Sequence, residues 1–110
     1  MEDIREIVDN LILELRRGTL VLSVLSQMRE PRYGYSLVEF LNGKGIPVEP
    51  GTLYPLLRRL EKQGLLSSEW ETSTAKPRKY YVLSEIGKDV YQKLCQEWKT
   101  MTASIDGILI

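Results

Sequence analysis

A change in the spacing of apolar residues near position 65 constrains the fold of this chain more than any other feature of its sequence. Before this point, apolar residues recur every three or four positions, which is typical of amphipathic helices. After it, residues 78–83 are rich in strand-forming side chains, and the polar segment 72–77 separates them from Leu66 and Trp70. The sequence therefore predicts an antiparallel hairpin with a loose tip, preceded by helices.

Four helical segments are predicted before the hairpin. The first is acidic and amphipathic, and the second has denser apolar residues, so we expect it to be more buried. Residues 16–19 bend or interrupt the chain between these two, and Pro31 ends the second, because the residue before a proline is pushed out of the helical conformation. The four segments are residues 4–15, 20–28, 34–42 and 50–63.

Two start points are open for the helix over residues 50–63. Pro50 suits a first helical position. Pro55 is tolerated without strain only near the start of a helix, which favours a later start with Thr52 as the cap. Gly64 suits the position after the last turn, where glycine adopts the left-handed conformation without strain. Both starts place the same side chains on the same faces.

Ser84 is a suitable N-cap for a last helix that extends to about residue 108. If the first two segments are counted as one bent or interrupted helix, the order is three helices, a hairpin and a final helix, which is the outline of a winged helix-turn-helix. We therefore predict a mainly α fold with a small β-hairpin, in one domain over residues 1–110. Residues 1–84 form the winged-helix region, including the N-terminal helix, and residues 85–110 form the C-terminal helix.

The chain has no histidine and one cysteine, Cys95. It therefore has no Ser-His or Cys-His nucleophile and no histidine-ligated zinc or haem. A single cysteine forms neither an internal disulfide nor a cysteine metal site. We predict that the protein is not an enzyme and holds no metal or cofactor.

The acidic N-terminus lacks the basic start of a signal peptide, and no apolar run reaches the roughly 18 residues of a membrane span. We therefore expect a cytoplasmic protein with no membrane partner.

Residues 51–63 separate into two faces when they are projected onto a helix. One arc collects the leucines expected in the core, which are Leu53, Leu56, Leu57 and Leu60. The opposite face is basic and carries Gly51, Tyr54, Pro55, Arg58, Arg59 and Lys62. An ordinary solvated surface is the alternative explanation for these cations.

The net charge of zero hides an uneven distribution of charge along the sequence. Residues 49–83 carry six basic and four acidic side chains, and three of the six lie in the segment 76–79 at the hairpin tip. Positive charge on one helix and the adjoining tip favours a polyanionic partner. The alternative for the tip is that its cations only keep an edge strand soluble.

Several motifs support a more specific interpretation. They are Tyr33-Gly34-Tyr35, residues 50–61, Gly64-Leu65-Leu66, and residues 77–84 with Gly87 behind them. Together they resemble the PadR family of transcriptional regulators over about residues 15–95, in the branch with a single C-terminal helix. The resemblance implies a winged-helix fold, a homodimer, double-stranded promoter DNA as target, and repression relieved by a small molecule.

We therefore expect a dimeric DNA-binding repressor in which the helix over residues 50–63 enters the major groove and the hairpin holds the phosphate backbone. The predicted DNA-binding residues are Tyr35, Thr52, Tyr54, Pro55, Arg58, Arg59, Lys62, Lys76, Arg78 and Lys79. The alternative is a winged-helix protein-interaction module without DNA binding, which the zero net charge favours.

The last helix carries an apolar stripe at steps of three and four, made of Ile86, Val90, Leu94, Trp98, Met101, Ile105 and Ile108. Its length of roughly 35 Å exceeds what a domain this small can cover. We expect its distal half and the helix over residues 4–15 to act as long dimerisation helices against a second copy. The alternative is that these two helices cover each other within one subunit.

The resemblance also implies a hydrophobic or aromatic effector near the dimer interface. Trp98 lies in the middle of the apolar stripe, and we expect it to contact this effector together with Leu94 and Met101. The alternative role for Trp98 is that of a packing anchor, which is common for aromatic residues at interfaces.

Overall fold

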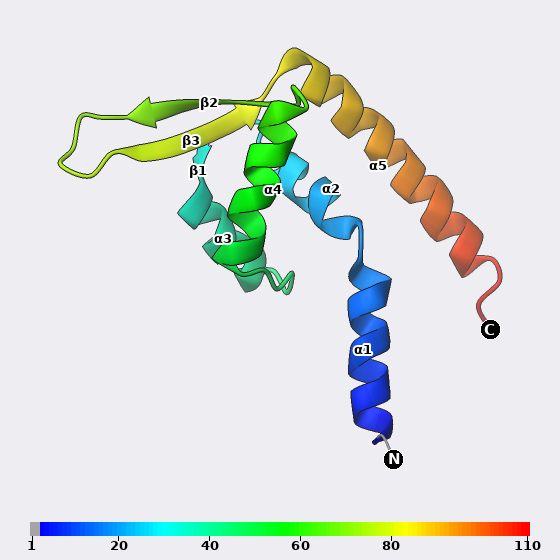
Figure 1. Ribbon diagram of the computed structural model, residues 1–110. Coiled ribbons are helices and arrows are strands. Elements are labelled where there is room, and N and C mark those ends of the chain that lie inside the picture. Colours follow the sequence, from blue (N-terminus) through cyan, green and yellow to red (C-terminus); the bar gives the residue numbers. More distant parts are fainter. Residues whose placement is uncertain (1–2) are drawn as a thin grey trace.

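The computed structural model describes residues 3–110 and shows a mainly helical chain with one small antiparallel sheet (Figure 1). This confirms the predicted fold class and the order of its helices and hairpin. The elements are α1 (Ile4–Arg16), α2 (Thr19–Ser26), β1 (Arg32–Tyr33), α3 (Gly34–Gly43), α4 (Pro50–Lys62), β2 (Leu66–Glu71), β3 (Arg78–Leu83) and α5 (Glu85–Asp106).

The core lies between α2, α3, α4 and the base of the sheet. Three of the leucines predicted to face inward, Leu53, Leu57 and Leu60, are almost completely buried, whereas Leu56 is half-buried at the edge. The other core residues are Val24, Leu25, Met28, Leu37, Leu41, Val48, Leu66, Tyr81 and Leu83. Burial of the leucine face fixes the rotation of α4, so its opposite face points into solvent.

The sheet has three strands in the order β1-β3-β2, and not the two strands that the sequence predicts. The unpredicted strand, β1, pairs antiparallel with β3 through Arg32 and Tyr33, which lie opposite Tyr81 and Tyr80. Two residues are too few to show the alternation by which a strand is recognised. The predicted hairpin itself is present, with β2 and β3 in register from Leu66 opposite Leu83 to the tip.

Helix α4 starts at Pro50, with Glu49 in the N-cap position, so the later cap at Thr52 is wrong. The helix continues through Pro55, which has no N–H to donate to the carbonyl of Gly51 one turn earlier. Both Gly51 and Pro55 are exposed, so water can solvate that carbonyl.

Ser84 caps the start of α5 as the sequence predicts. Its hydroxyl accepts a hydrogen bond from the Gly87 N–H at 3.0 Å and donates to the carbonyl of Gly64. The Ser84 N–H donates to the carbonyl of Leu65 at 3.0 Å. These bonds tie the first turn of α5 to the segment between α4 and β2.

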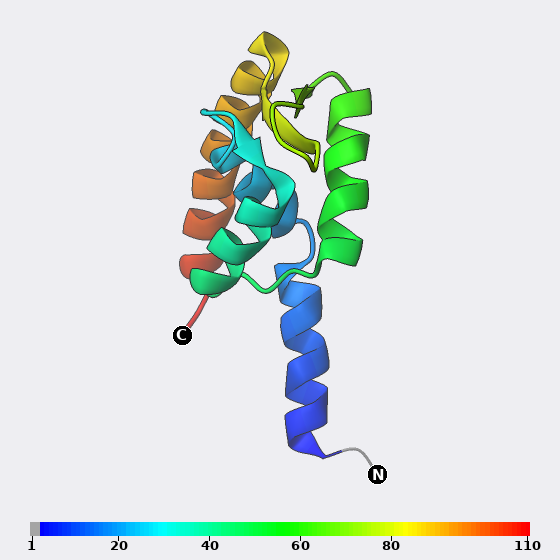
Figure 2. The same ribbon diagram turned by 90° about the vertical axis from the view of Figure 1, so that its left-hand side faces the viewer.

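Helix α1 stands apart from the rest of the chain (Figures 1 and 2). All of its residues are exposed, and the Arg16 guanidinium anchors its end by donating to the Gly45 carbonyl at 3.1 Å. Gly18, between α1 and α2, has φ of +90°, which breaks the helix as expected from residues 16–19. Helices α1 and α5 therefore do not cover each other within one subunit.

Helix α5 packs on α2 with its first half, through half-buried residues such as Tyr91 and Leu94. Farther along, Trp98, Met101 and Ile105 are each more than two-fifths exposed. Within residues 3–110, none of the helices combines the length and the apolar character of a membrane span.

Candidate nucleic-acid interface

The exposed face of α4 carries the cations that the sequence places there. Arg58, Arg59 and Lys62 are all exposed, on the side of the helix that faces away from the buried leucines. Helix α4 therefore offers guanidinium and ammonium groups to a partner without disturbing the core.

The middle of α4, the start of α3 and the wing (β2, β3 and the tip 72–77) meet around a hollow of about 390 Å³, which we call the wing corner. The predicted residues that line it come from three different elements, which the fold brings together. They are Tyr35, Tyr54, Arg58, Arg78 and Lys79.

The remaining predicted residues lie elsewhere. Thr52, Pro55 and Arg59 line a second hollow on the other side of α4, which Gly18 and Val21 also border. Lys62 lies exposed in the last turn of α4, and Lys76 lies exposed in the wing tip. The predicted set is therefore spread over two sides of α4 and the tip, with its densest group at the wing corner.

Arg78 is held by aromatic side chains from β1 and α3. Its guanidinium carbon lies 4.7 Å from the ring centroid of Tyr33 and 5.7 Å from that of Tyr35. One guanidinium nitrogen also donates to the Tyr35 hydroxyl at 2.9 Å. Such cation–π contacts contribute about 0.5–1 kcal/mol at exposed sites. They attach the wing to the start of α3 while Arg78 itself stays exposed.

Among the described residues, Lys79 differs from the other wing cations in forming an ion pair. Its ammonium nitrogen lies 3.2 Å from a carboxylate oxygen of Glu61 on α4. The Ser68 hydroxyl donates to the same carboxylate, and this bond, followed by those from Lys79, lowers the pKa of Glu61 against the opposing effect of burial. Glu61 therefore stays ionised at neutral pH and balances the charge of Lys79.

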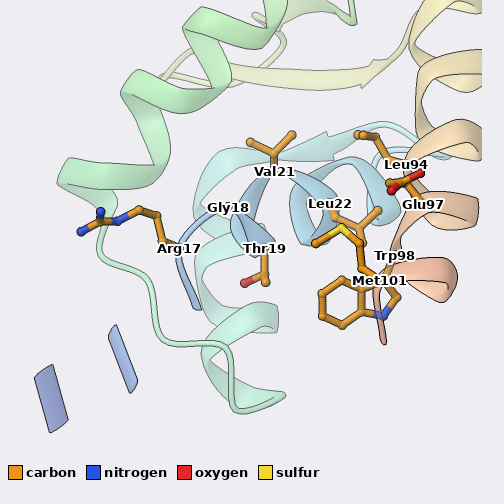
Figure 3. Close-up of a pocket in the computed structure, with 9 residues that line it drawn as sticks. All are labelled: Arg17, Gly18, Thr19, Val21, Leu22, Leu94, Glu97, Trp98 and Met101. Atoms are coloured by element: carbon orange, nitrogen blue, oxygen red, sulfur yellow. The ribbon is translucent and has the colours of Figure 1, made fainter. Parts of the chain in front are cut away.

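A separate apolar pocket of about 220 Å³ lies between α2 and α5 (Figure 3). Val21 and Leu22 form its α2 side, and all three predicted effector residues, Leu94, Trp98 and Met101, form its α5 side. Arg17 and Glu97 add charged groups to its lining. The indole of Trp98 is 43% exposed, so one chain leaves a large part of it uncovered.

Comparison with known proteins connects this arrangement to a family. Residues 21–93, more than half of the chain, match the family described as "Transcriptional regulator PadR-like family". The chain belongs to this PadR-like family. The resemblance stated from the sequence motifs is therefore confirmed, and the protein is a transcriptional regulator of this family.

Solved structures and a curated relative agree. This chain is similar to the crystal structure of a PadR family transcriptional regulator from Eggerthella lenta, with a TM-score of 0.91 and 50% sequence identity. The match covers 96% of this chain and 94% of that one. A PadR-like transcriptional regulator from Bacillus cereus gives a TM-score of 0.77 at 28% identity, over 86% and 95% of the two chains. A transcriptional regulator of Mycobacterium tuberculosis is 36% identical over 76 residues, which are 68% of this chain and 71% of that protein.

Three residues at the wing corner of this PadR-family chain lie outside the predicted set: Gly34, Trp70 and the buried core residue Tyr81. Gly34 lies against the ring of Tyr54, and a Cβ at Gly34 would come within 2.5 Å of Tyr54 Cε1. Trp70 borders the hollow from β2. Strand alternation could have placed Trp70 on the face shared with Leu66, but its exposure depends on where α4 stops covering the sheet.

Within residues 3–110 of the PadR-family chain, no group of three or more histidine, cysteine, aspartate or glutamate side chains is arranged to hold a metal ion.

Proposed function

We propose that this PadR-family regulator is a sequence-specific DNA-binding repressor that acts on promoter DNA as a homodimer and is released by a small hydrophobic or aromatic effector. The observation that carries the proposal is the wing corner, where α4, α3 and the wing present Arg58, Arg78 and two tyrosines on one exposed side. The relatives described above are themselves named transcriptional regulators.

In this proposal α4 is the helix that enters the major groove. An α-helix with its side chains is about 10–12 Å in diameter and the major groove is about 12 Å wide, so α4 fits with its leucine face turned back to the core. Arg58 then faces the base edges, where an arginine pairs with guanine through two parallel hydrogen bonds. Arg59 and Lys62, on the flanks of the same face, are placed for phosphates.

The wing adds sequence-independent binding. Lys76 and Arg78 are exposed, and neither has a carboxylate partner in an ion pair among the described residues. Lys79 forms an ion pair with Glu61 that balances its charge, so we assign the main phosphate contacts of the wing to Lys76 and Arg78. Because these phosphate contacts are ionic, we expect DNA binding to weaken steeply as the salt concentration increases.

A homodimer is supported by two helices with uncovered apolar side chains. An isolated helix shorter than about 12–15 residues is marginal in water, yet α1 has 13 residues and is exposed throughout. A second copy would cover the apolar side of α1, with Ile4, Ile7, Val8, Leu11, Ile12 and Leu15, and the distal part of α5, with Trp98, Met101, Ile105 and Ile108. We therefore propose that residues 85–110 form the dimerisation helix and residues 1–84 the DNA-binding region.

The effector site proposed here is the pocket between α2 and α5. Its lining is mainly apolar, which suits a flat hydrophobic molecule, and the half-exposed indole of Trp98 offers a stacking surface. Its volume of about 220 Å³ is below the roughly 300–1,000 Å³ of common ligand sites. In a dimer, the second copy would add a further wall along α5, so the volume enclosed by the site would be larger.

A DNA-binding experiment tests the functional proposal with two variants that fail in different ways. Arg58→Ala is expected to lower affinity for the gene's own upstream DNA about tenfold and to relax base preference at one position in each half-site. Lys76→Ala is expected to weaken all sequences alike and to reduce the slope of log affinity against log salt by about one. Binding curves at several salt concentrations, on upstream and scrambled duplexes, measure both effects.

The matched control is Lys99→Ala, which removes an exposed cation from α5, away from its apolar stripe and from the wing corner. It should bind DNA like the parent protein. If the parent protein showed no salt-dependent binding to any duplex, the DNA-binding proposal would be wrong. The second candidate, a winged-helix protein-interaction module that the zero net charge favours, would then take its place.

The effector proposal is tested by fluorescence in a Trp70→Phe background, where Trp98 is the only indole. Planar aromatic compounds are expected to quench the Trp98 emission, because stacking brings them into direct contact with the ring. Trp98→Ala is expected to weaken their binding about tenfold, as followed by calorimetry. Unchanged binding to Trp98→Ala would place the effector elsewhere.

A further inference from the structure

Trp70 is a large aromatic side chain that the chain leaves 60% exposed on its wing. It lies opposite Lys79 in the register of β2 and β3, on the strand face that it shares with Leu66 and Ser68. Exposure increases along this face toward the tip, from buried Leu66 through half-buried Ser68 to exposed Trp70. Helix α4 therefore covers the base of this strand face but leaves Trp70 exposed.

The surroundings of Trp70 are cationic and aromatic. It lines the wing corner together with Tyr54, Arg58 and Lys79, and of the two cations Arg58 is exposed whereas Glu61 balances the charge of Lys79. The acidic residues next to it in β2, Glu69 and Glu71, point to the opposite face of the strand. Each of them accepts a hydrogen bond there, Glu69 from the Tyr80 hydroxyl and Glu71 from Ser73. The face that carries Trp70 thus suits a partner with negative charge.

The position of Trp70 also separates it from the surfaces proposed for dimerisation. In Figure 1 the wing extends to the left of the molecule, whereas α1 and α5 lie on its right-hand side. A second copy that covers those two helices has no reason to reach the wing corner. The exposed indole is therefore left for a different partner, and the exposed Arg58 beside it favours an anionic one.

We propose that Trp70 contacts the DNA backbone: its ring packs against a deoxyribose, and its indole N–H donates a hydrogen bond to a phosphate oxygen. The inference rests on the proposed function. If α4 lies in the major groove and the wing tip reaches the adjacent minor groove, the corner between them crosses the sugar-phosphate strand that separates the two grooves. The indole N–H is a neutral hydrogen-bond donor, so it can bind a phosphate oxygen without forming an ion pair.

This contact has a signature that distinguishes it from the cationic contacts. Trp70 reads no base, so its loss should weaken upstream and scrambled DNA alike. It also carries no charge, so its loss should leave the slope of log affinity against log salt unchanged, whereas Lys76→Ala reduces that slope by about one. Removal of the N–H alone and removal of the whole ring should have graded effects.

The first measurement uses a Trp98→Phe background, in which Trp70 is the only tryptophan. Its emission should change on titration with upstream and with scrambled duplex DNA, over the same concentration range in which anisotropy of labelled DNA reports binding.

The second measurement uses Trp70→Phe and Trp70→Ala in the otherwise unchanged chain. We expect a loss of affinity of about threefold for Trp70→Phe and about tenfold for Trp70→Ala, on both duplexes. Thermal melting of each variant checks that the fold is retained, which the exposure of Trp70 favours.

The possible outcomes separate this inference from the proposed function. If the parent chain binds DNA while Trp70 emission stays constant, or if Trp70→Ala binds as tightly as the parent, the assignment of Trp70 is overturned and the proposed function stands. A loss confined to the upstream duplex would overturn the backbone contact, because the indole would then read a base. If the parent chain binds neither duplex at low salt, both the proposed function and the inference fall.

Discussion

Replacing Gly87 by alanine is expected to destabilise the chain by about 3 kcal/mol, toward the upper end of what single substitutions do. A Cβ at this position would overlap the carbonyl oxygen of Leu65 and lie 3.1 Å from Leu83 Cδ2. The Leu65 carbonyl cannot move aside easily, because it accepts the hydrogen bond from the Ser84 N–H. The first turn of α5 must therefore shift away from the core, at the cost of its cap.

Urea denaturation and thermal melting at one protein concentration measure this effect. A loss of this size corresponds to a fall in Tm of about 12 °C for a domain of this length. The control is Gly43→Ala at the end of α3, where an added Cβ meets no atom within 4 Å. Alanine favours the helix there, so this variant should be as stable as the parent or up to about 1 kcal/mol more stable. A Gly87→Ala chain that melts with the parent would contradict the packing of α5 on Leu65.

Ile105→Asp is expected to turn the proposed homodimer into folded monomers. Within one chain the Ile105 side chain is 49% exposed, so the charge hardly affects the fold of a single subunit. In the proposed interface the same carboxylate would be buried without a partner, which costs several kcal/mol and weakens association about a thousandfold. Sedimentation velocity over a range of concentrations measures the change.

Two comparisons sharpen this test. Thr100→Asp adds the same charge to an exposed position off the apolar stripe of α5, and it should remain dimeric. Leu94 is less suitable than Ile105, because it also packs against the core of its own chain and its substitution would disturb folding. A dimeric Ile105→Asp variant would place the interface away from the distal half of α5.

The larger features of the fold could be predicted because they depend on local patterns. The leucine face of α4, the Ser84 cap and the strand-forming residues of β3 each extend over a few neighbouring residues, and these predictions are confirmed except that Leu56 is only half-buried. Strand β1 gave no such pattern, since it is two residues long and owes its conformation to pairing with β3. The start of α4 was left open because two prolines favour different caps.

The candidate site could be predicted in its residue types and only partly in its geometry. Periodicity identified Arg58 on the outer face of α4, and the stripe of α5 identified the residues that line the pocket with Trp98. The pairing of Lys79 with Glu61 joins a strand to a helix, and no rule of spacing connects those two positions. The contact between Gly34 and Tyr54 is of the same kind, because it depends on how α3 and α4 pack.

The short stretch of chain at the start of α2 has a thermodynamic consequence for regulation. Gly18 and Val21 line both the pocket beside Trp98 and the hollow beside Arg59 on α4, so the two sites share a wall. In the proposed function, an effector that shifts this wall would change the free energy of DNA binding through it. Such coupling is reciprocal. Bound operator DNA must therefore lower the affinity for the effector by the same factor by which bound effector lowers the affinity for the operator. A regulator that is bound to its promoter would then respond to a higher effector concentration than the same protein free in solution.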